Sequence, residues 1–384
     1  MTRDDRLSST GKPYAEISAG DLSVLTELQS EWEDLLGDTI RNEPFLHPAW
    51  FRAYASAFEA GKQIAALTVR RAGTLTGVIP LVRDTRCFGT LPARTLRSLS
   101  GKHSPRFDCI VSKQDHSATI EAAWQSLRAD ISWDVLEALD VPDGGAFEDL
   151  SAQAAKDGYL VSKWPTLLSP YLPVSESPAD PFIQSPNRYR KARARLQSSL
   201  RRLATNGDVA FKCDSSDCRS ALHRFVTMEM AGWKGVRGSA IGCSKQAMTF
   251  YSQVVEEFAK TGSLRIYTLW LNQTPVAMEL GLVVDRTYFA PKATYDEQFA
   301  SFSPGHLLTR HVISDLAEHG ISRYDFLGPR ARHKTLWAGE VLPHAHYLIF
   351  SPTFLGQLRH IAVDKVAPLL RNAKRRFVPD PQDQ

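Results

Sequence analysis

The sequence predicts an α/β protein made of two similar halves, each a mixed twisted sheet flanked by helices. Its 384 residues exceed what one hydrophobic core usually serves. Apolar segments of strand length and helix length recur along the chain, and the order of elements in the first half returns in the second. Hydrophobic residues make up 43% and charged residues 23%, the composition of an ordinary globular protein.

The first half is expected over residues 15–165. The dipeptide Ala72-Gly73, followed by Thr74, joins two apolar strands and is a good hairpin signal. Helical and strand periodicities predict the other elements. The helices are expected at 21–36, 49–57, 117–129 and 147–157, and the strands at 64–71, 75–82, 95–100, 108–111 and 134–139.

The second half is expected over residues 187–352, after a Pro- and Ser-rich crossover at 166–186 and before a basic helix and tail at 353–384. Its helices are expected at 187–204, 218–230, 245–261, 307–319 and 354–377, and its strands at 209–212, 264–271, 276–284, 287–294, 322–327 and 347–350. A Ser-Pro-Gly-His loop at 303–306 opens one of these helices behind the sheet. Free backbone N–H groups at a helix start form a natural anion site, so the loop indicates a cofactor with phosphates.

Several motifs resemble the CelD-type (BioF2-like) acetyltransferase family. They are PFLHPAW at 44–50, IPL at 79–81, PVA at 275–277, ATYD at 293–296, SPGHLL at 303–308 and YDFLG at 324–328, with Lys334 and Trp337. That family belongs to the GNAT superfamily and is related to the FemABX aminoacyltransferases, which carry two GNAT-like halves. The resemblance implies tandem GNAT-like domains and acyl transfer, usually from acyl-coenzyme A, to an amine or a hydroxyl.

Two residues are candidates for the general base. Alternation along strand 276–284 places Ala277, Glu279 and Gly281 on one face. Small neighbours leave room for a ligand, and burial raises the pKa of a carboxyl towards the range useful to a base. The alternative is an edge-strand Glu that faces water. His306 either takes the proton instead or caps the helix and contacts phosphate.

The resemblance assigns the phosphates of acyl-coenzyme A to Ser303, Gly305, Leu307 and Leu308. Gly305 lets the backbone approach a pyrophosphate. The alternative is an ordinary Pro-Gly turn before a helix. No metal is expected, since none of the five cysteines shows CxxC spacing.

The acceptor is expected to contact polar and aromatic side chains from both halves. The loop 102–108 is dense in polar residues and suits acceptor recognition across the interface between the halves, or is a solvated turn. Asp325 and Lys334 either orient the acceptor amine together or form a buried structural ion pair. The residues assigned to the acceptor are His103, Ser104, Arg106, Asp108, Trp233, Tyr295, Asp325, Lys334 and Trp337, with Tyr295 and Trp337 as pocket walls.

Two basic helices, at 187–204 and 354–377, carry an apolar stripe and suit an anionic membrane surface, or else a solvated face over packed residues. The expected location is cytoplasmic, peripheral at the inner face of the membrane, and nucleic acid is not an expected partner. The sequence thus predicts an acyl-coenzyme A-dependent N-acyltransferase for an envelope-related acceptor. A lipid amine such as a sphingoid base, as in a ceramide synthase, is preferred. The alternatives are a polysaccharide or amino sugar, an aminoacyl-tRNA-dependent FemABX-like transferase, and a non-catalytic scaffold of envelope biosynthesis.

Overall fold

The computed structural model describes residues 11–88, 90–174, 186–214 and 217–366, with only the backbone of 186–193 and 365–366. The strands within these residues are β1 (Tyr14–Gly20), β2 (Gln63–Arg71), β3 (Thr74–Phe88), β4 (Leu91–Ser98), β5 (Ile110–Val111), β6 (Val135–Pro142), β7 (Leu160–Pro173), β8 (Val209–Asp214), β9 (Leu264–Leu271), β10 (Thr274–Val284), β11 (Thr287–Tyr295), β12 (Arg323–Asp325) and β13 (Glu340–Phe350). The helices are α2 (Ser23–Glu27), α3 (Gln29–Leu36), α4 (Pro48–Phe58), α5 (His116–Ala129), α6 (Ala146–Lys156), α7 (Pro186–Ala204), α8 (Cys218–Ala231), α9 (Trp233–Val236), α10 (Lys245–Lys260), α11 (Pro304–Glu318), α12 (Arg332–Thr335) and α13 (Phe354–Ile361). Short 3-10 helices lie at Pro44–Leu46, Ile241–Cys243 and Glu297–Phe302, and a π-helical segment lies at Ala362–Val366.

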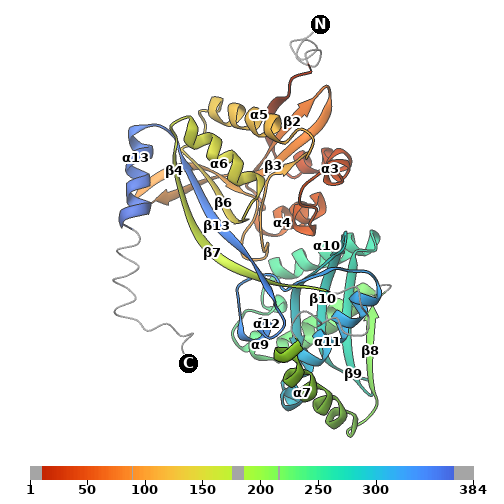
Figure 1. Cartoon of the computed structure of the whole chain (residues 1–384). Helices are drawn as coiled ribbons and strands as arrows, with labels where there is room; N and C mark the ends of the chain where they lie inside the picture. Colours follow the sequence, from red (N-terminus) through yellow and green to blue (C-terminus); the bar gives the residue numbers. More distant parts are fainter. Residues whose placement is uncertain (1–10, 89, 175–185, 215–216, 367–384) are drawn as a thin grey trace.

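One continuous sheet runs through both halves (Figure 1). Its strand order is β1-β2-β3-β4-β6-β13-β7-β12-β11-β10-β9-β8, and β5 pairs with β3 beside this path. In the first half β1 to β4 are antiparallel neighbours and β6 runs parallel to β4. In the second half β8 to β11 are antiparallel neighbours and β12 runs parallel to β11. The repeated topology confirms the prediction of two similar halves.

The halves exchange their last strands. Strand β7 leaves the first half and pairs with β12 of the second, whereas β13 ends the second half and pairs with β6 of the first. The two exchanged strands also pair with each other along their length, and they form the long diagonal that joins the halves in Figure 1.

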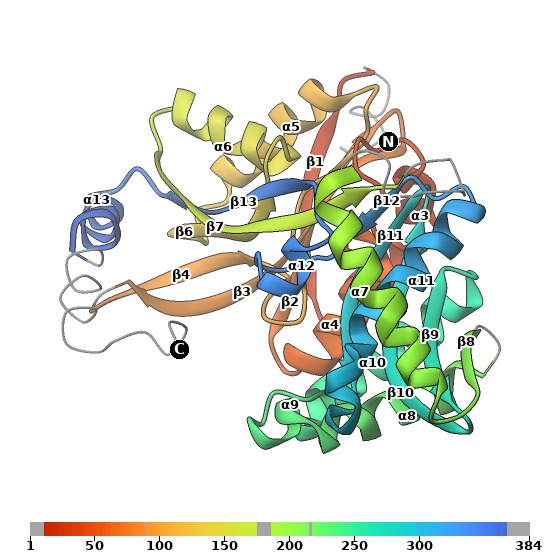
Figure 2. The same ribbon diagram turned by 60° about the horizontal axis from the view of Figure 1, so that its bottom comes forward.

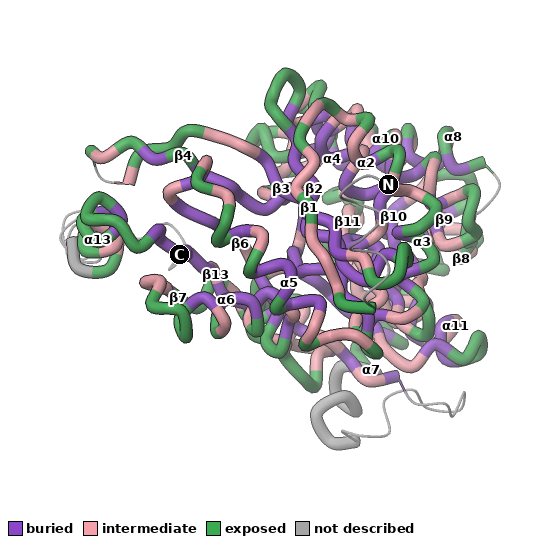
Figure 3. The backbone as a smooth tube through the Cα atoms, turned by 90° about the horizontal axis from the view of Figure 1, so that it is seen from above, coloured by how far each residue is buried: buried purple, intermediate pink, exposed green. Residues whose placement is uncertain are grey.

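Helices cover both faces of the second half. Helix α11 packs on β9, β10 and β11 with α7 outside it, and Figure 2 shows these two helices side by side. Helices α8 and α10 lie on the opposite face, where α10 also packs against α4 of the first half. Aromatic contacts such as Phe45 with Phe289 and Trp50 with Phe250 continue one hydrophobic core across this interface. Figure 3 shows the buried strands at the centre and the exposed outer helix faces.

Most predicted elements are present with shifted ends. Residues Ala72 and Gly73 both have positive φ and close the predicted hairpin. The predicted helix at 21–36 is divided into α2 and α3 at Leu28, and strand β1 was not predicted. The Pro- and Ser-rich crossover begins as strand, because β7 continues to Pro173; Pro165 and Pro170 are accommodated within the ladder with β13. The rest of that stretch, 175–185, and the tail 367–384 lie outside the described residues.

Candidate active site

The parallel pair β11 and β12 opens after three residues. Residues 287–289 of β11 pair with 323–325 of β12, where β12 ends, while β11 continues to Tyr295 without a strand on that side. Opposite β10 the ladder is irregular, since Leu280 pairs with Lys292 and Leu282 already pairs with Phe289. A bulged strand with a free edge presents unpaired backbone groups to a ligand. Residues 290–295 therefore form an edge without a neighbouring strand in the middle of the sheet, which we call the free edge; of its outward groups, the Ala293 carbonyl accepts a hydrogen bond from Lys234 Nζ (2.8 Å).

The N-terminus of α11 lies at the end of the free edge. Ser303 is left-handed (φ 55°, ψ 50°) and its side chain caps no helix N–H group. Among the described residues the N–H groups of Gly305 and His306 have no hydrogen-bond acceptor, whereas that of Leu307 bonds to Ser303 O (3.1 Å). A Cβ at Gly305 would lie 3.7 Å from Tyr295 Cδ1, so the helix start and the free edge are adjacent. Two backbone donors and the helix dipole thus face the opening.

The assignment of Ser303, Gly305, Leu307 and Leu308 to the phosphates of acyl-coenzyme A stays a prediction. Leu307 and Leu308 are each 2% exposed and belong to the core beneath α11. Their side chains therefore cannot contact a cofactor. The open N–H groups of Gly305 and His306 are the atoms of this loop that remain available for an anion.

Glu279 is buried on the α11 face of β10. Its Oε1 accepts hydrogen bonds from the hydroxyls of Tyr288 (2.9 Å) and Tyr324 (2.6 Å). Burial raises its pKa to about 7, although both hydroxyls act to lower it. The prediction of room for a ligand beside Glu279 is wrong, because a Cβ at Gly281 would lie 2.0 Å from Tyr288 Cζ. The tyrosine ring occupies that space. The alternative of a Glu that faces water is also wrong, because Glu279 is only 3% exposed.

The molecular surface nevertheless opens next to Glu279. Ala293 is its direct cross-strand partner, shares its face of the sheet and is exposed. Tyr324 connects Glu279 with α11, since its hydroxyl also interacts with the Thr309 hydroxyl. Thr309 in turn donates to Gly305 O (3.0 Å). The hydroxyls of Thr309 and Tyr324 therefore lie between the open turn of α11 and the buried carboxyl, and Tyr324 donates its proton to Glu279 while Thr309 donates to Gly305 O.

His306 is fixed by Trp337. The indole Nε1–H donates to His306 Nδ1 (3.0 Å), and burial lowers the pKa of the imidazole. An indole N–H can only donate, so Nδ1 must carry the lone pair and the proton of the neutral ring must lie on Nε2. His306 thus presents an N–H donor at the helix start. Trp337 itself is 3% exposed, so it supports His306 rather than forming an open pocket wall.

Asp325 does not pair with Lys334. Its Oδ2 accepts from Arg106 Nη2 and from Arg323 Nη2, each at 3.0 Å, and its Oδ1 accepts from Leu327 N (3.0 Å). Arg106 is completely buried and also bonds both oxygens of Glu43 (3.0 and 3.1 Å). Two of the residues expected to bind the acceptor, Arg106 and Asp325, therefore bind each other across the halves.

Lys334 holds the turn at which the sheet opens. Its Nζ donates to Leu327 O (2.6 Å), and burial lowers its pKa to about 8 while Asp325 opposes this change. Leu327 has a φ of 52°, a conformation that costs a side-chain-bearing residue energy. Bonds at its N–H and its carbonyl stabilise that conformation. The strain lies directly after β12, across the opening from Ser303.

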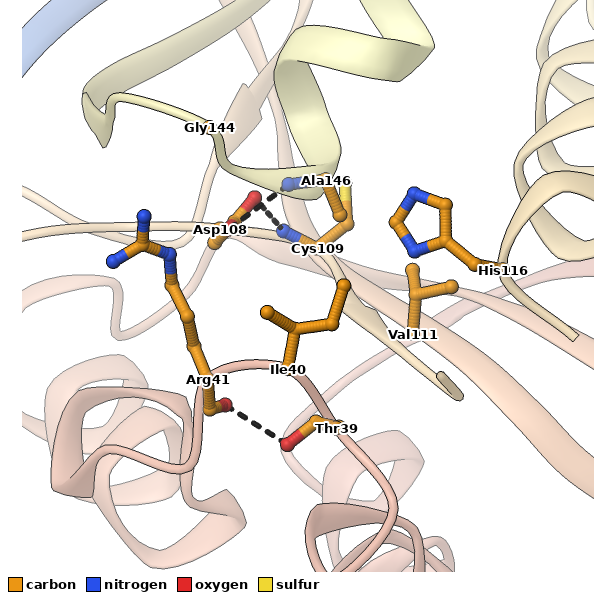
Figure 4. A pocket seen from close by; sticks show the side chains of 9 residues that line it. All are labelled: Thr39, Ile40, Arg41, Asp108, Cys109, Val111, His116, Gly144 and Ala146. Carbon is orange, nitrogen blue, oxygen red and sulfur yellow. Dashed lines mark hydrogen bonds between the residues drawn. The ribbon is translucent and has the colours of Figure 1, made fainter. Parts of the chain in front are cut away.

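The polar loop 102–108 has mainly structural roles. Ser104 Oγ accepts from Trp50 Nε1 (3.1 Å). Asp108 accepts from the N–H groups of Ala146 and Phe147 and so caps α6. Burial raises the pKa of Asp108 to about 6. A small pocket beside Asp108, lined also by Arg41, lies wholly within the first half (Figure 4).

His103 is the member of that loop that lies between the halves. Its ring stacks on Phe58 and meets Tyr251 of α10 edge-on, and burial together with nearby lysines lowers its pKa to about 4. Trp233 is 46% exposed, with the cations of Lys234 and Arg237 over its ring. Both residues remain accessible near the interface between the halves.

Several residues at the site were missed. Tyr324 lies in the YDFLG motif but was not assigned a role. Tyr288 and Lys292 lie outside all the motifs. Alternation alone could have placed Tyr288 on the face of Glu279. In the described residues no group of three or more His, Cys, Asp or Glu side chains is arranged to hold a metal ion, and no helix is long and apolar enough to cross a membrane.

The chain was compared with known protein families, curated proteins and solved structures. The sequence of residues 190–335 matches the family described as acetyltransferase (GNAT) domain. None of the curated proteins matches the sequence.

The fold is similar to that of several solved structures. FemX is similar with a TM-score of 0.56 at 12% identity, covering 90% of this chain and 100% of that one. A C-terminal domain described as that of a lysylphosphatidylglycerol synthetase from Agrobacterium fabrum has a TM-score of 0.54 at 11% identity, over 90% and 97% of the chains. A conserved protein of unknown function from Bacteroides thetaiotaomicron has a TM-score of 0.52 at 9% identity, over 88% and 100%. Residues 190–335 are therefore similar to a GNAT acetyltransferase domain, and the fold of the whole chain is similar to that of FemX.

Proposed function

We propose that this protein is an N-acyltransferase that transfers an acyl group from acyl-coenzyme A to an amine. The observation that carries the proposal is the free edge beside the open N-terminus of α11. Unpaired strand groups can bond the amides of the pantetheine arm as an added strand would. The N–H groups of Gly305 and His306 can bind the pyrophosphate of the same donor.

In the proposed reaction the acceptor nitrogen attacks the thioester carbonyl. A C–N bond forms, the C–S bond breaks, and coenzyme A leaves as the thiol once it has taken up a proton. Negative charge develops on the carbonyl oxygen, and a fixed donor next to that atom lowers the barrier. We assign this role to His306 Nε2–H, because Trp337 occupies the only lone pair with which the neutral ring could act as a base.

Glu279 is the proposed final acceptor of the amine proton. Its raised pKa of about 7 suits a group that exchanges protons near neutrality. Since the carboxyl is buried, the proton reaches it through the hydroxyl of Tyr324, which bonds to it at 2.6 Å and borders Thr309. Tyr288 bonds the same oxygen but lies outside this path.

The donor assignment is tested by binding. The purified protein is heated with acyl-coenzymes A of several chain lengths, and thiol release is followed with an amine mixture. Stabilisation and thiol release are expected with at least one chain length. Stabilisation by none of them would refute the donor assignment and favour aminoacyl-tRNA or a scaffold role.

A matched pair of variants localises the phosphate site. Gly305 has room for a side chain, since the nearest atom to an added Cβ is at 3.7 Å. Gly305→Asp adds a negative charge at the helix start and is expected to weaken acyl-coenzyme A binding by about tenfold or more. Gly305→Asn adds the same volume without charge and should lose much less affinity. Equal losses would contradict binding of phosphate at this turn.

One structural observation supports a lipid amine as the proposed acceptor class. Four apolar side chains of α13 are exposed, namely Phe354, Leu355, Leu358 and Ile361. They recur at the spacing of one helix face, and α13 projects from the side of the molecule (Figures 1 and 2). Such a face suits shallow insertion into a lipid surface.

A further inference from the structure

The interface between the halves contains a lysine, Lys292, that makes no ion pair among the described residues. Lys292 lies on the free edge and shares the face of its cross-strand partner Leu280, opposite to the face of Glu279. Its Nζ is 5.3 Å from the ring centre of Tyr251 on α10. His103 of the first half packs edge-on against the same ring. Elements of both halves therefore surround this ammonium group.

The neighbouring charges do not neutralise it. In the part of the chain that the structure describes, Lys292 makes no ion pair or hydrogen bond, while Lys102 and Lys234 add positive charge nearby. Glu229 is the nearby carboxylate, but its Oε1 accepts from Lys234 Nζ (2.9 Å) and its Oε2 from Ile241 N (2.7 Å). Three lysines thus share one carboxylate whose oxygens are both already bonded.

A partly buried, unpaired ammonium group is costly, and such groups concentrate where a ligand supplies the missing partner. Burial indeed lowers the pKa of Lys292, which shows that its charge is poorly compensated. The other two half-buried lysines of this region, Lys234 and Lys334, have hydrogen-bond acceptors within the protein. Lys234 bonds Glu229 and Ala293 O, and Lys334 bonds Leu327 O. Lys292 alone of these three is left for a ligand within the described structure.

We infer that the amine acceptor also carries an anionic group, a carboxylate or a phosphate, which Lys292 binds in the space between the halves. The inference rests on the proposed function and names its acceptor class. Lys102, which is exposed, attracts the same group from solvent, and the half-buried ring of His103 borders it. A sphingoid base without such a group would meet only positive charge here.

The free edge lets one ligand contact both faces of the sheet. Beyond Phe289 no strand flanks β11 on the side of β12, so nothing in the sheet separates Lys292 from its neighbour Ala293. Ala293 faces the side of Glu279 and is exposed. An acceptor bound by its anion at Lys292 can therefore direct its amine around this edge towards the thioester.

The first test measures binding without activity. The intact protein is treated with limiting acetic anhydride, and modification of each lysine is measured by mass spectrometry. Glutarate and inorganic phosphate, added separately, are expected to protect Lys292 at least threefold and to leave exposed Lys156 and Lys245 unprotected. The more protective anion identifies the carboxylate or phosphate class. Protection by neither, or equal protection of all three lysines, would overturn the inference.

The donor is controlled in the same experiment. Coenzyme A itself carries phosphates, so it is added alone and together with the small anions. If coenzyme A alone protects Lys292 fully and glutarate and phosphate do not, the lysine belongs to the donor site and the acceptor inference is wrong. Additional protection by a small anion in saturating coenzyme A supports it.

The second test compares paired acceptors in the thiol-release assay. The pairs are glutamate with glutamate diamide, phosphoethanolamine with ethanolamine, and sphingosine phosphate with sphingosine. The anionic member of at least one pair is expected to have the lower KM. Lys292→Met should raise that KM at least tenfold while the KM of acyl-coenzyme A stays constant, and Lys292→Arg should retain most of the affinity. Thiol release that is equal within every pair would refute the inference and leave the proposed acyl transfer intact.

Discussion

Replacing Glu279 by Gln should make the stability of the protein less dependent on pH. The pKa of the buried carboxyl is about 7, against an ordinary value of 4.5, so the native state favours the protonated form. Below pH 4.5 the group is protonated in both states and imposes no penalty. Between pH 4.5 and 7 the unfolded chain ionises this group while the native state keeps it protonated, so at about 1.4 kcal/mol per pH unit the penalty grows to about 3 kcal/mol and stays constant above pH 7.

Most of this penalty develops in an accessible range. Between pH 5.5 and 8.5 it grows by about 2 kcal/mol, and Glu279→Gln removes it because an amide does not ionise. The amide oxygen can still accept from Tyr288 and Tyr324. Urea unfolding at both pH values should thus show the variant gaining about 2 kcal/mol relative to the parent protein at the higher pH.

The exposed carboxyl of Glu340 on β13 provides the control. Glu340→Gln also replaces a carboxylate by an amide, but at an exposed position. Its effect on the free energy of unfolding should be nearly the same at both pH values. If Glu279→Gln behaved like this control, the native carboxyl would already be ionised at pH 5.5. Glu279 would then not be a base that exchanges protons near neutrality, whatever the variant did to turnover.

Three further variants test separate parts of the structure. Arg106→Leu leaves Glu43 and Asp325 buried without their partner and should cost about 3–5 kcal/mol of unfolding free energy, with part recovered in the double variant Arg106→Leu/Glu43→Leu; a loss below about 1 kcal/mol would show that the network is dispensable. His306→Ala should lower kcat about 100-fold at every pH, because a donor is lost; a change confined to one limb of the pH profile would instead identify a base. Phe354→Asp on α13 should weaken sedimentation with phosphatidylglycerol vesicles, whereas Ile131→Asp, at an equally exposed apolar residue of the first half, should not; no binding by the parent protein would remove the lipid surface from the proposal.

The sequence was sufficient for most helices and strands and for the two-half organisation, because hydrophobic periodicity is local. The alternation along β10 correctly placed Met278 and Leu280 opposite Glu279, and the two-residue turn at Ala72-Gly73 was recognised from its residues. The exchange of β7 and β13 was not predictable in this way. It depends on pairing between segments about half the chain apart, and no local pattern encodes that choice of partner.

Side-chain partners were harder to predict for the same reason. Asp325 and Lys334 are close in sequence, which suggested a pair, but Arg106 lies 219 residues from Asp325. Its guanidinium bonds Asp325 through Nη2 and a second carboxylate, Glu43, through Nη1. Asp108 looked like a recognition residue because it is polar on a loop, yet it satisfies the first turn of α6. A polar residue in a loop is available to a ligand only if the backbone groups around it find other partners.

The first half shapes the site of the second half. Strand β12 ends where the sheet opens. Its side opposite β11 pairs with β7, which comes from the first half. Arg106 binds the same end of β12 through Asp325, and Asp325 in turn holds the left-handed turn at Leu327. The first half therefore contributes a buried arginine at the end of β12 in addition to its own sheet. The exchanged strand and the arginine together fix how far β11 extends beyond its neighbour, and this extension is the edge on which both the donor and the acceptor are proposed to bind.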